Sequence, residues 1–380
     1  VTDGRLELSP EVRRHLELCL DCRACETACP SGVQYGRLIE PFRIAMDQIG
    51  EEAEKHDDWF RRWILHGLFP YPRRLANFLR PARFAQRTGL MWVAEHLGMM
   101  RLLSPRLRQL TAMLPPARRR GRRLPEILPA IGKPRARVAL FTGCVADVFF
   151  RPTHWATARV LQHNGCDVLV PRTQQCCGAI HLHSGASDPA RRLADANMEV
   201  FKVDEYDAVI VNVAGCGAML KDYGHHWLDD KTAEREQFAT KVKDVHEFLA
   251  ELGPVAPHGE INLTATYHDA CHLVHAQKIR EAPRKLLSLI PGLTVRDLPE
   301  SELCCGAAGT YNLTQPEMAQ RLARRKLQNI QGTGASAVIT ANAGCILQIA
   351  REARNQGQRL PVYHPMDLLD ASYRGKKPRK

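Results

Sequence analysis

The stretches QQCCGAI (residues 174–180) and ELCCGAA (302–308) stand at matching places in a longer pattern that occurs twice in this chain of 380 residues. The flanking matches are VALFTGCV (138–145) with TATYHDAC (264–271), and DAVIVNVAGCGAML (207–220) with SAVITANAGCILQI (336–349). The matched cysteines are Cys144 with Cys271, Cys176 with Cys304, and Cys216 with Cys345. Three matched positions at a nearly constant offset indicate an internal duplication.

From Val138 onward, short apolar runs alternate with amphipathic helical segments, a pattern typical of βαβ units and a parallel sheet. A helix start with proline in its first turn follows each Cys-Cys-Gly, at Ser187-Asp188-Pro189 and at Thr314-Gln315-Pro316-Glu317. The second start also predicts a capping box from Thr314 to Glu317. We therefore expect two similar α/β lobes related by an approximate twofold axis.

Each repeat carries four cysteines at predicted strand ends, where parallel α/β folds build their sites. The two sets are Cys144, Cys176, Cys177 and Cys216 in the first repeat, and Cys271, Cys304, Cys305 and Cys345 in the second. Flanking glycines let the backbone approach a bulky inorganic cluster, so we expect each set to converge on one. The alternatives are a buried cysteine pair, a vicinal disulfide, or zinc in one repeat with nitrogen ligands from His268, His272 or His275. Cys166 lies outside both sets and is predicted to be a core or surface residue.

A third group of cysteines lies near the start, in CLDCRACETACP (19–30). Its spacing, C-x2-C-x2-C-x3-C-P, is that of bacterial ferredoxins, so Cys19, Cys22, Cys25 and Cys29 are predicted to bind a [4Fe–4S] cluster rather than zinc. In two-cluster ferredoxins the fourth cysteine of such a run serves the other cluster. Because no second run is present, we expect it to lie upstream of Val1, with a second cluster.

The charge is concentrated in one segment. The chain has a net charge of +12, yet residues 61–123 alone hold 15 arginines and one acid, Glu95, which leaves about −2 for the rest. The segment from 59 to 123 is predicted to form helices broken by prolines and to dock on an anionic membrane face or an acidic partner subunit. A nucleic-acid partner is not expected, because basic charge without a recognised reader module is weak evidence.

Composition excludes several classes of protein. There is no apolar run of about 18 residues or more and no signal-peptide core near the start, so we expect a cytoplasmic protein without a transmembrane helix. Thirteen cysteines in such a chain indicate metal or redox centres rather than structural disulfides. Dinucleotide-binding, P-loop and nucleophile-elbow motifs are absent, so the chain carries no signature of an organic cofactor and no catalytic residue is predicted.

These features predict an α plus α/β protein with four parts. The expected boundaries are 1–58 for an α-helical ferredoxin-like domain, 59–137 for an arginine-rich helical segment and linker, 138–258 for the first cysteine-rich lobe and 259–380 for the second. The basic, proline-rich stretch that opens at Pro115 separates the helical segment from the lobes.

The sequence resembles the family of the glycolate oxidase iron–sulfur subunit, within the wider group of cysteine-rich (CCG) domain proteins. The resemblance covers nearly the whole chain and is carried by CLDCRACETACPSG (19–32), LQHNGCDVLVPRTQQCCGA (161–179), HAQK (275–278), LCCGAAGTYNLTQPEMA (303–319) and TANAGC (340–345). Two departures stand out. Members usually carry two ferredoxin runs, and the wider group often ends each repeat with C-x2-C, where this chain has Met219 and Gln348.

The resemblance implies an electron-transfer subunit of a glycolate or other 2-hydroxy acid dehydrogenase, an oxidoreductase. A separate FAD-containing subunit would hold the substrate, and electrons would pass through this chain towards quinone, at the inner face of the cell membrane. The alternatives are a lactate-utilisation subunit or a thiol–disulfide reductase of the heterodisulfide class. The missing fifth cysteines count against the latter, although four thiolates per repeat suffice for a [4Fe–4S] cluster.

Overall fold

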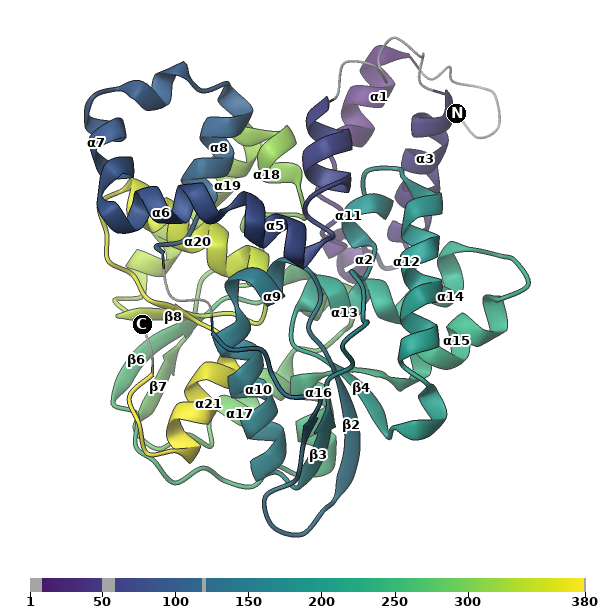
Figure 1. Ribbon diagram of the computed structural model, residues 1–380, viewed down its shortest axis with the longest axis vertical. Coiled ribbons are helices and arrows are strands. Elements are labelled where there is room, and N and C mark those ends of the chain that lie inside the picture. Colours follow the sequence, from purple (N-terminus) through teal and green to yellow (C-terminus); the bar gives the residue numbers. More distant parts are fainter. Residues whose placement is uncertain (1–8, 50–58, 118–120, 379–380) are drawn as a thin grey trace.

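The computed structural model describes residues 9–49, 59–117 and 121–378. Parts of the predicted ferredoxin-like domain (1–8 and 50–58), of the predicted linker (118–120) and of the second lobe (379–380) lie outside these described residues. Figure 1 shows two sheets in the lower part of the molecule, with the helices that precede the lobes above them.

The first lobe contains a five-stranded sheet in the order β1-β3-β2-β4-β5. Its strands are β1 (Ile127–Leu128), β2 (Ala136–Phe141), β3 (Cys166–Leu169), β4 (Ala208–Val211) and β5 (Val242–Asp244). All pairings are parallel except that of β1, which runs antiparallel to β3. The predicted linker therefore contributes an edge strand to the first lobe.

The second lobe contains a parallel four-stranded sheet in the order β7-β6-β8-β9. Its strands are β6 (Leu263–Tyr267), β7 (Leu293–Arg296), β8 (Ala337–Ile339) and β9 (Val362–Tyr363). This order matches β3-β2-β4-β5 strand for strand. The register agrees too, because Val138 pairs with Ala208 and Ala265 with Ala337, pairs that the alignment of the two repeats makes equivalent.

Helices connect the strands of each lobe. In the first lobe they are α9 (Val145–Phe149), α10 (Arg151–His163), α11 (Ala179–Leu182), α12 (Ser187–Val200), η3 (Val203–Glu205), α13 (Ala214–Lys221), α14 (Tyr223–His226), α15 (Thr232–Lys241) and α16 (Val245–Leu252). In the second they are η4 (His272–Ala276), α17 (Glu281–Leu287), α18 (Tyr311–Thr314), α19 (Pro316–Gly332), α20 (Ala343–Asn355) and α21 (Pro365–Tyr373).

The helix contacts show how the lobes are related. Helix α10 packs on α21, and α17 packs on α16. Since α17 takes the place of α10 in the second lobe and α21 takes that of α16, the exchanged pairing is that of an approximate twofold axis. Buried apolar residues of both sheets, including Val138, Ile210, Ala265 and Ile339, belong to one continuous core across this interface.

The remaining helices precede the lobes. They are α1 (Pro10–Glu17), α2 (Ala24–Ala28), α3 (Gly36–Ile49), the π-helix η1 (Phe60–His66), α5 (Pro72–Phe78), α6 (Arg80–Thr88), α7 (Leu90–His96), η2 (Met99–Leu102) and α8 (Pro105–Met113). Pro72 and Pro105 occupy first turns, where proline fits because its missing N–H has no helical partner, so they begin helices rather than break them. Phe60, Leu65 and Leu75 share a buried cluster with Val148 of the first lobe and Leu313 of the second.

The capping-box prediction for α19 was wrong. The N-cap is Gln315, whose side chain makes no cap hydrogen bond. Thr314 instead ends the preceding helix α18, and its hydroxyl donates to the carbonyl of Tyr311 at 3.3 Å. The prolines at both helix starts were placed correctly, since Pro189 and Pro316 lie in the first turns of α12 and α19.

Candidate functional site: three cysteine sets

The first lobe brings its four predicted cysteines together above the carboxyl ends of its strands. Cys144 precedes α9 after β2, the Cys176–Cys177 pair follows β3, and Cys216 lies in the first turn of α13 after β4. The sulfur atoms of Cys144 and Cys176 are 3.3 Å apart. The Cys177 thiol interacts with the thiols of Cys176 and Cys216, so the four form one continuous group.

The second lobe repeats this arrangement. Cys271 precedes η4, the Cys304–Cys305 pair lies in the loop after β7, and Cys345 lies in the first turn of α20. Cys304 interacts with Cys271 and Cys305, and Cys305 interacts with Cys345. The two predicted sets therefore converge, each within its own lobe.

Glycine makes room for both cysteine pairs. Gly178 and Gly306 have φ values of +90° and +84°, and their N–H groups lie 3.5 Å and 3.4 Å from the sulfurs of Cys176 and Cys304. A Cβ atom at Gly306 would lie 2.5 Å from the carbonyl oxygen of Ala319. The backbone therefore turns to direct an N–H donor at sulfur, where it stabilises a thiolate.

The crowded thiols suit a metal centre. Interaction with Cys144, followed by that with Cys177 and by burial, raises the pKa of Cys176, and interaction with Cys304 and burial raise that of Cys271. Thiols packed this closely cannot all ionise unless a cationic centre takes up their charge.

Sequence reasoning missed Lys326, which faces the second cysteine set. This fully buried lysine lies on α19, and its Nζ donates to the carbonyl oxygens of Glu300 and Ser301. Burial lowers its pKa, whereas the neighbouring thiols of Cys305 and Cys345 act in the opposite direction. Ionised thiols at this site would favour the charged form of the lysine. A lysine on the buried face of a predicted helix was the available signal.

The three histidines near Cys271 have different surroundings. His272 places Nδ1 3.5 Å from the sulfur of Cys271, whereas Nδ1 of His275 is 2.8 Å from the hydroxyl of Thr27 on α2. His268 instead lies with Cys305 and Cys345. Burial lowers the pKa of His268 to about 3, so its imidazole is neutral.

The predicted ferredoxin run lies against the lobes. Burial raises the pKa of Cys22 to about 11, and the charges of Cys271, Cys19 and Cys25 act in the same direction, which places Cys22 between its own run and the second lobe. Backbone N–H groups, first that of Val33, lower the pKa of Cys29, and no cysteine of the described chain contributes. Three cysteines of the run are thus grouped, and the fourth stands apart.

A buried ionic network fixes the run in place, and sequence reasoning did not find it. Arg23 pairs with Glu40 at 3.0 Å and with Asp21 at 3.3 Å. His183 of the first lobe lies 3.2 Å from Asp21. Burial lowers the pKa of His183, but the nearby carboxylates of Asp21 and Glu40 outweigh it and raise the pKa to about 9. Because His183 is far from Asp21 and Glu40 in the chain, no local sequence pattern signals the network.

Backbone and amide contacts join the two cysteine sets. The side-chain amide of Asn342 donates to the sulfur of Cys345 at 3.3 Å, and its oxygen accepts from the N–H of Gly215, next to Cys216, at 3.4 Å. The N–H of Ala214 also donates to the carbonyl of Ala341. The three cysteine sets therefore occupy one connected region where the run and both lobes meet.

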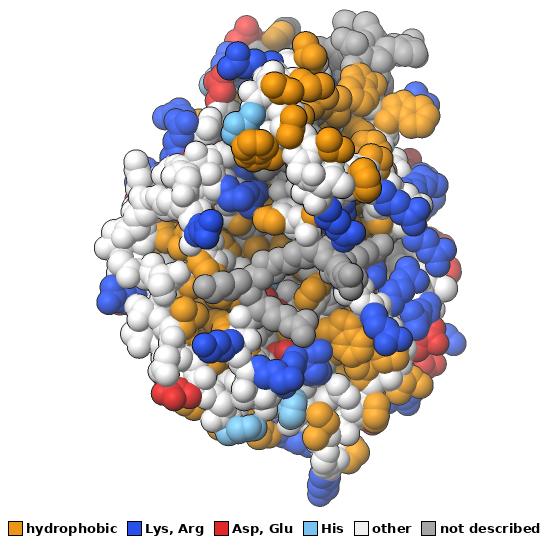
Figure 2. All heavy atoms as spheres, turned by 60° about the vertical axis from the view of Figure 1, so that its left-hand side comes forward, with side chains coloured by type: hydrophobic (Ala, Val, Ile, Leu, Met, Phe, Trp, Pro, Cys, Tyr) orange, Lys and Arg blue, Asp and Glu red, His pale blue; other side chains and the backbone are white. Residues whose placement is uncertain are grey.

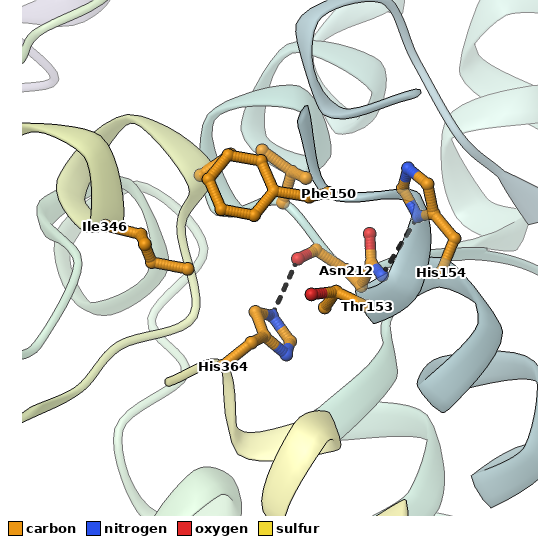
Figure 3. A pocket seen from close by; sticks show the side chains of 8 residues that line it. Phe150, Thr153, His154, Asn212, Ile346 and His364 are labelled. Atoms are coloured by element: carbon orange, nitrogen blue, oxygen red, sulfur yellow. Dashed lines mark hydrogen bonds between the residues drawn. The ribbon is translucent and has the colours of Figure 1, made fainter. Parts of the chain in front are cut away.

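The best-defined cavities are too small for an organic substrate. One lies between the lobes and has a volume of about 10 Å³, roughly room for one water molecule. Figure 3 shows its lining, in which His364 donates from Nε2 to the carbonyl of Asn212 at 2.8 Å, and the Asn212 amide lies 3.2 Å from His154. Burial lowers the pKa of His154 to about 4. These neutral histidines join the two lobes through their contacts with Asn212. A second cavity of about 10 Å³ adjoins His183 and His272.

Comparison with known proteins agrees with this arrangement. The "Cysteine-rich domain" (CCG) family matches residues 138–221 and 265–350, which hold the two cysteine sets. The "Glycolate oxidase iron-sulfur subunit, linker region" family matches residues 56–114. The probable glycolate oxidase iron–sulfur subunit of Bacillus subtilis (strain 168) is 38% identical over 97% of this chain and 85% of its own length.

This chain belongs to the glycolate oxidase iron–sulfur subunit family. The glycolate oxidase iron–sulfur subunit of Escherichia coli (strain K12) is 31% identical over 96% of this chain and 83% of its own length. Lactate utilization protein A of Shouchella clausii (strain KSM-K16) is 32% identical over 62% of this chain and 98% of its own length. The family resemblance expected from the sequence is confirmed. The ligand roles of individual cysteines stay predictions.

Proposed function

We propose that this chain is the electron-transfer subunit of a membrane-associated glycolate dehydrogenase. The observation that carries the proposal is the convergence of three cysteine sets in one region, with Asn342 bridging two of them. Iron–sulfur clusters, when bound, accept and release single electrons. Cys19, Cys22 and Cys25 would hold one [4Fe–4S] cluster, completed by a ligand outside these residues. Cys29 would serve a second cluster.

The lobes would each hold a further cluster, with ligands drawn from their sets of four cysteines. The residues fit such a group, because four thiols, backbone N–H donors and, in the second lobe, the buried cation of Lys326 all favour bound thiolate. Met219 and Gln348 are both buried, and the Gln348 side chain is occupied by hydrogen bonds with Asn312 and Ala319. The fifth donor expected of a heterodisulfide reductase is therefore not supplied from these positions.

The substrate would be oxidised on another, FAD-containing subunit. The water-sized cavities support this division, since neither can enclose a 2-hydroxy acid. The matching linker family favours glycolate. Lactate is the second candidate substrate, because lactate utilization protein A aligns over almost its whole length.

The complex purified anaerobically through a tag on this chain tests the proposal. We expect bound flavin and reduction of the iron–sulfur EPR signals when glycolate is added. Reduction by lactate but not by glycolate would favour the second candidate. A complex without flavin, whose iron–sulfur signals respond to neither acid, would refute the proposed function.

The arginine-rich helices would dock the complex on the membrane. Among the described residues no helix is long and apolar enough to cross a bilayer. Trp63, Phe84 and Trp92 are nevertheless 68%, 63% and 61% exposed. Figure 2 brings the side of the molecule that carries α7 forward, and hydrophobic side chains gather in its upper part with Lys and Arg beside them. Exposed aromatics among cations suit the interface of an anionic membrane.

Sedimentation with phosphatidylglycerol-containing vesicles tests this docking. Arg61 pairs with Asp47, so the exposed Arg62, Arg73 and Arg80 are better targets. Near anionic lipid each cation contributes about 1 kcal/mol, so changing all three to Gln should weaken binding roughly 100-fold.

The charge-matched control changes three exposed cations of the second lobe to Gln: Arg321, Arg359 and Lys377. Equal vesicle binding by both variants, or binding by neither variant nor wild type, would refute membrane docking. Loss of complex assembly in the first variant alone would point to an acidic partner instead.

A further inference from the structure

His268 presents an unpaired ring nitrogen inside the second lobe. The residue is fully buried directly after β6, and its backbone N–H donates to the carbonyl of Ile339 at 2.9 Å. Its Nδ1 lies 2.9 Å from the carbonyl oxygen of Ser301. Because a carbonyl can only accept, Nδ1 carries the proton and Nε2 keeps its lone pair. That Nε2 is buried and has no hydrogen-bond partner within the described part of the chain.

The imidazole of His268 lies beside two thiols. The ligand atoms of His268, Cys305 and Cys345 all lie within 4.8 Å of one another. Donors about 2.0–2.3 Å from one metal ion are at most about 4.6 Å apart, so only a small adjustment would let the three share an ion. A buried acceptor without a donor is costly in a protein interior, and a metal ion would satisfy it.

The surroundings of His268 are those of a ligating imidazole. Histidines that bind metals usually donate their other ring N–H to a carbonyl or carboxylate, which fixes the ring and its tautomer. The contact of Nδ1 with Ser301 supplies this feature. Asn342 donates to the sulfur of Cys345 at 3.3 Å, so a second donor atom of the same group is also held in position.

The first lobe lacks the same donor. The alignment that matches Cys144 with Cys271 makes Phe141 the equivalent of His268, and Phe141 has no atom that can bind a metal. Val213 likewise occupies the position of Asn342. The first-lobe equivalent of Lys326 is Asn197, because Ala190 and Ala319 contact the matching glycines Gly178 and Gly306, and Asn197 and Lys326 each follow seven residues later. The duplicated sites therefore share their cysteines but differ in the polar groups around them.

We propose that Nε2 of His268 is a ligand of the metal centre in the second lobe, which is therefore held by imidazole and thiolate, whereas the first lobe has no histidine at the equivalent position. The inference rests on the proposed function only in that the second lobe binds a metal. A neutral imidazole in place of a thiolate makes the site less negative. The second-lobe centre should therefore accept an electron more readily than its partner.

Pulsed EPR of the full chain, purified anaerobically after labelling with 15N-histidine, tests the ligand directly. The wild type should show a 15N hyperfine coupling to a reduced iron centre, and His268→Leu should lose it. His272→Leu is the matched control, since it removes a neighbouring imidazole and should keep the coupling. His268→Cys restores a donor and should recover the iron content without the coupling.

The outcomes separate this inference from the proposed function. A cysteine variant of the second set, Cys304→Ser with Cys305→Ser, identifies which metal belongs to that lobe. Iron there without any 15N coupling in the wild type, or a coupling that survives in His268→Leu, overturns the inference and leaves the electron-transfer role intact. Zinc there, lost in His268→Leu and bound by nitrogen in X-ray absorption spectra, supports the ligand and contradicts a cluster in the second lobe. If His268→Leu does not fold, His268→Cys decides the question, because it keeps a donor atom at this position and should still lose the coupling.

Discussion

Replacing the glycine of each Cys-Cys-Gly with alanine should damage the two lobes unequally. Both glycines have φ values near +90°, where alanine costs about 1–2 kcal/mol. At Gly178 the new Cβ would lie 3.2 Å from the carbonyl oxygen of Ala190, which needs only a small shift. At Gly306 it would lie 2.5 Å from that of Ala319. Such an overlap adds about 1–3 kcal/mol, so Gly306→Ala should cost about 2–5 kcal/mol and Gly178→Ala about 1–2 kcal/mol.

Hydrogen exchange measured by mass spectrometry gives the local readout that this comparison needs. Peptides from α19 should lose protection in Gly306→Ala, whereas peptides from α12 should change less in Gly178→Ala. Metal should also be lost more readily from the second lobe of Gly306→Ala. Equal loss of protection at α12 and α19, or full protection in Gly306→Ala, would show that the backbone does not hold the cysteine pair as described.

Three further predictions concern charge and the first cysteine run. The folded state raises the pKa of His183 to about 9, so its stabilising effect is fully present below its unfolded pKa of about 6.5 and is lost as pH rises through 9. Thermal melts from pH 6 to 10 should show this loss of stability, and His183→Gln should make the melting temperature depend less on pH over this range. Lys326→Met should lower the reduction potential of the second-lobe centre by roughly 50–100 mV, because a buried unit charge nearby is worth about 1–2 kcal/mol. Lys326→Arg keeps the charge and should keep the potential. A redox titration in which the potential of Lys326→Met is higher than that of the wild type would contradict this. Cys22→Ser should remove a [4Fe–4S] signal and leave protection in β2 and β6 unchanged, and exchange of those strands in the variant would contradict separate folding of the lobes.

The lobes could be predicted from the sequence because their signal is local and repeated. The spacing among Cys144, Cys176 and Cys216 recurs among their counterparts and placed every one of these cysteines at the correct strand end. The same logic failed at Thr314, whose hydroxyl bonds within the preceding turn instead of capping α19. Spacing alone shows which residues follow a strand, but the competition between two local hydrogen bonds is settled by the backbone around them.

The contacts between distant segments could not be predicted. Asp21 and Glu40 contact His183 only after the N-terminal helices pack on the first lobe, and no periodicity links these positions. His268 was one of three histidines near Cys271, and the sequence could not tell which of them faces the other thiols. That choice depends on the register of β6 with β8, which directs His268 towards Cys305 and Cys345.

Iron and sulfide analysis combined with EPR on the anaerobically purified full chain tests the central claim most directly. The wild type should contain several iron and sulfide per chain and give reducible [4Fe–4S] signals. Cys176→Ser and Cys304→Ser should each remove a separate share of the iron. A folded, anaerobically prepared chain that binds zinc or no metal at all, with no sulfide and no EPR signal on reduction, would contradict an electron-transfer role for the three cysteine sets.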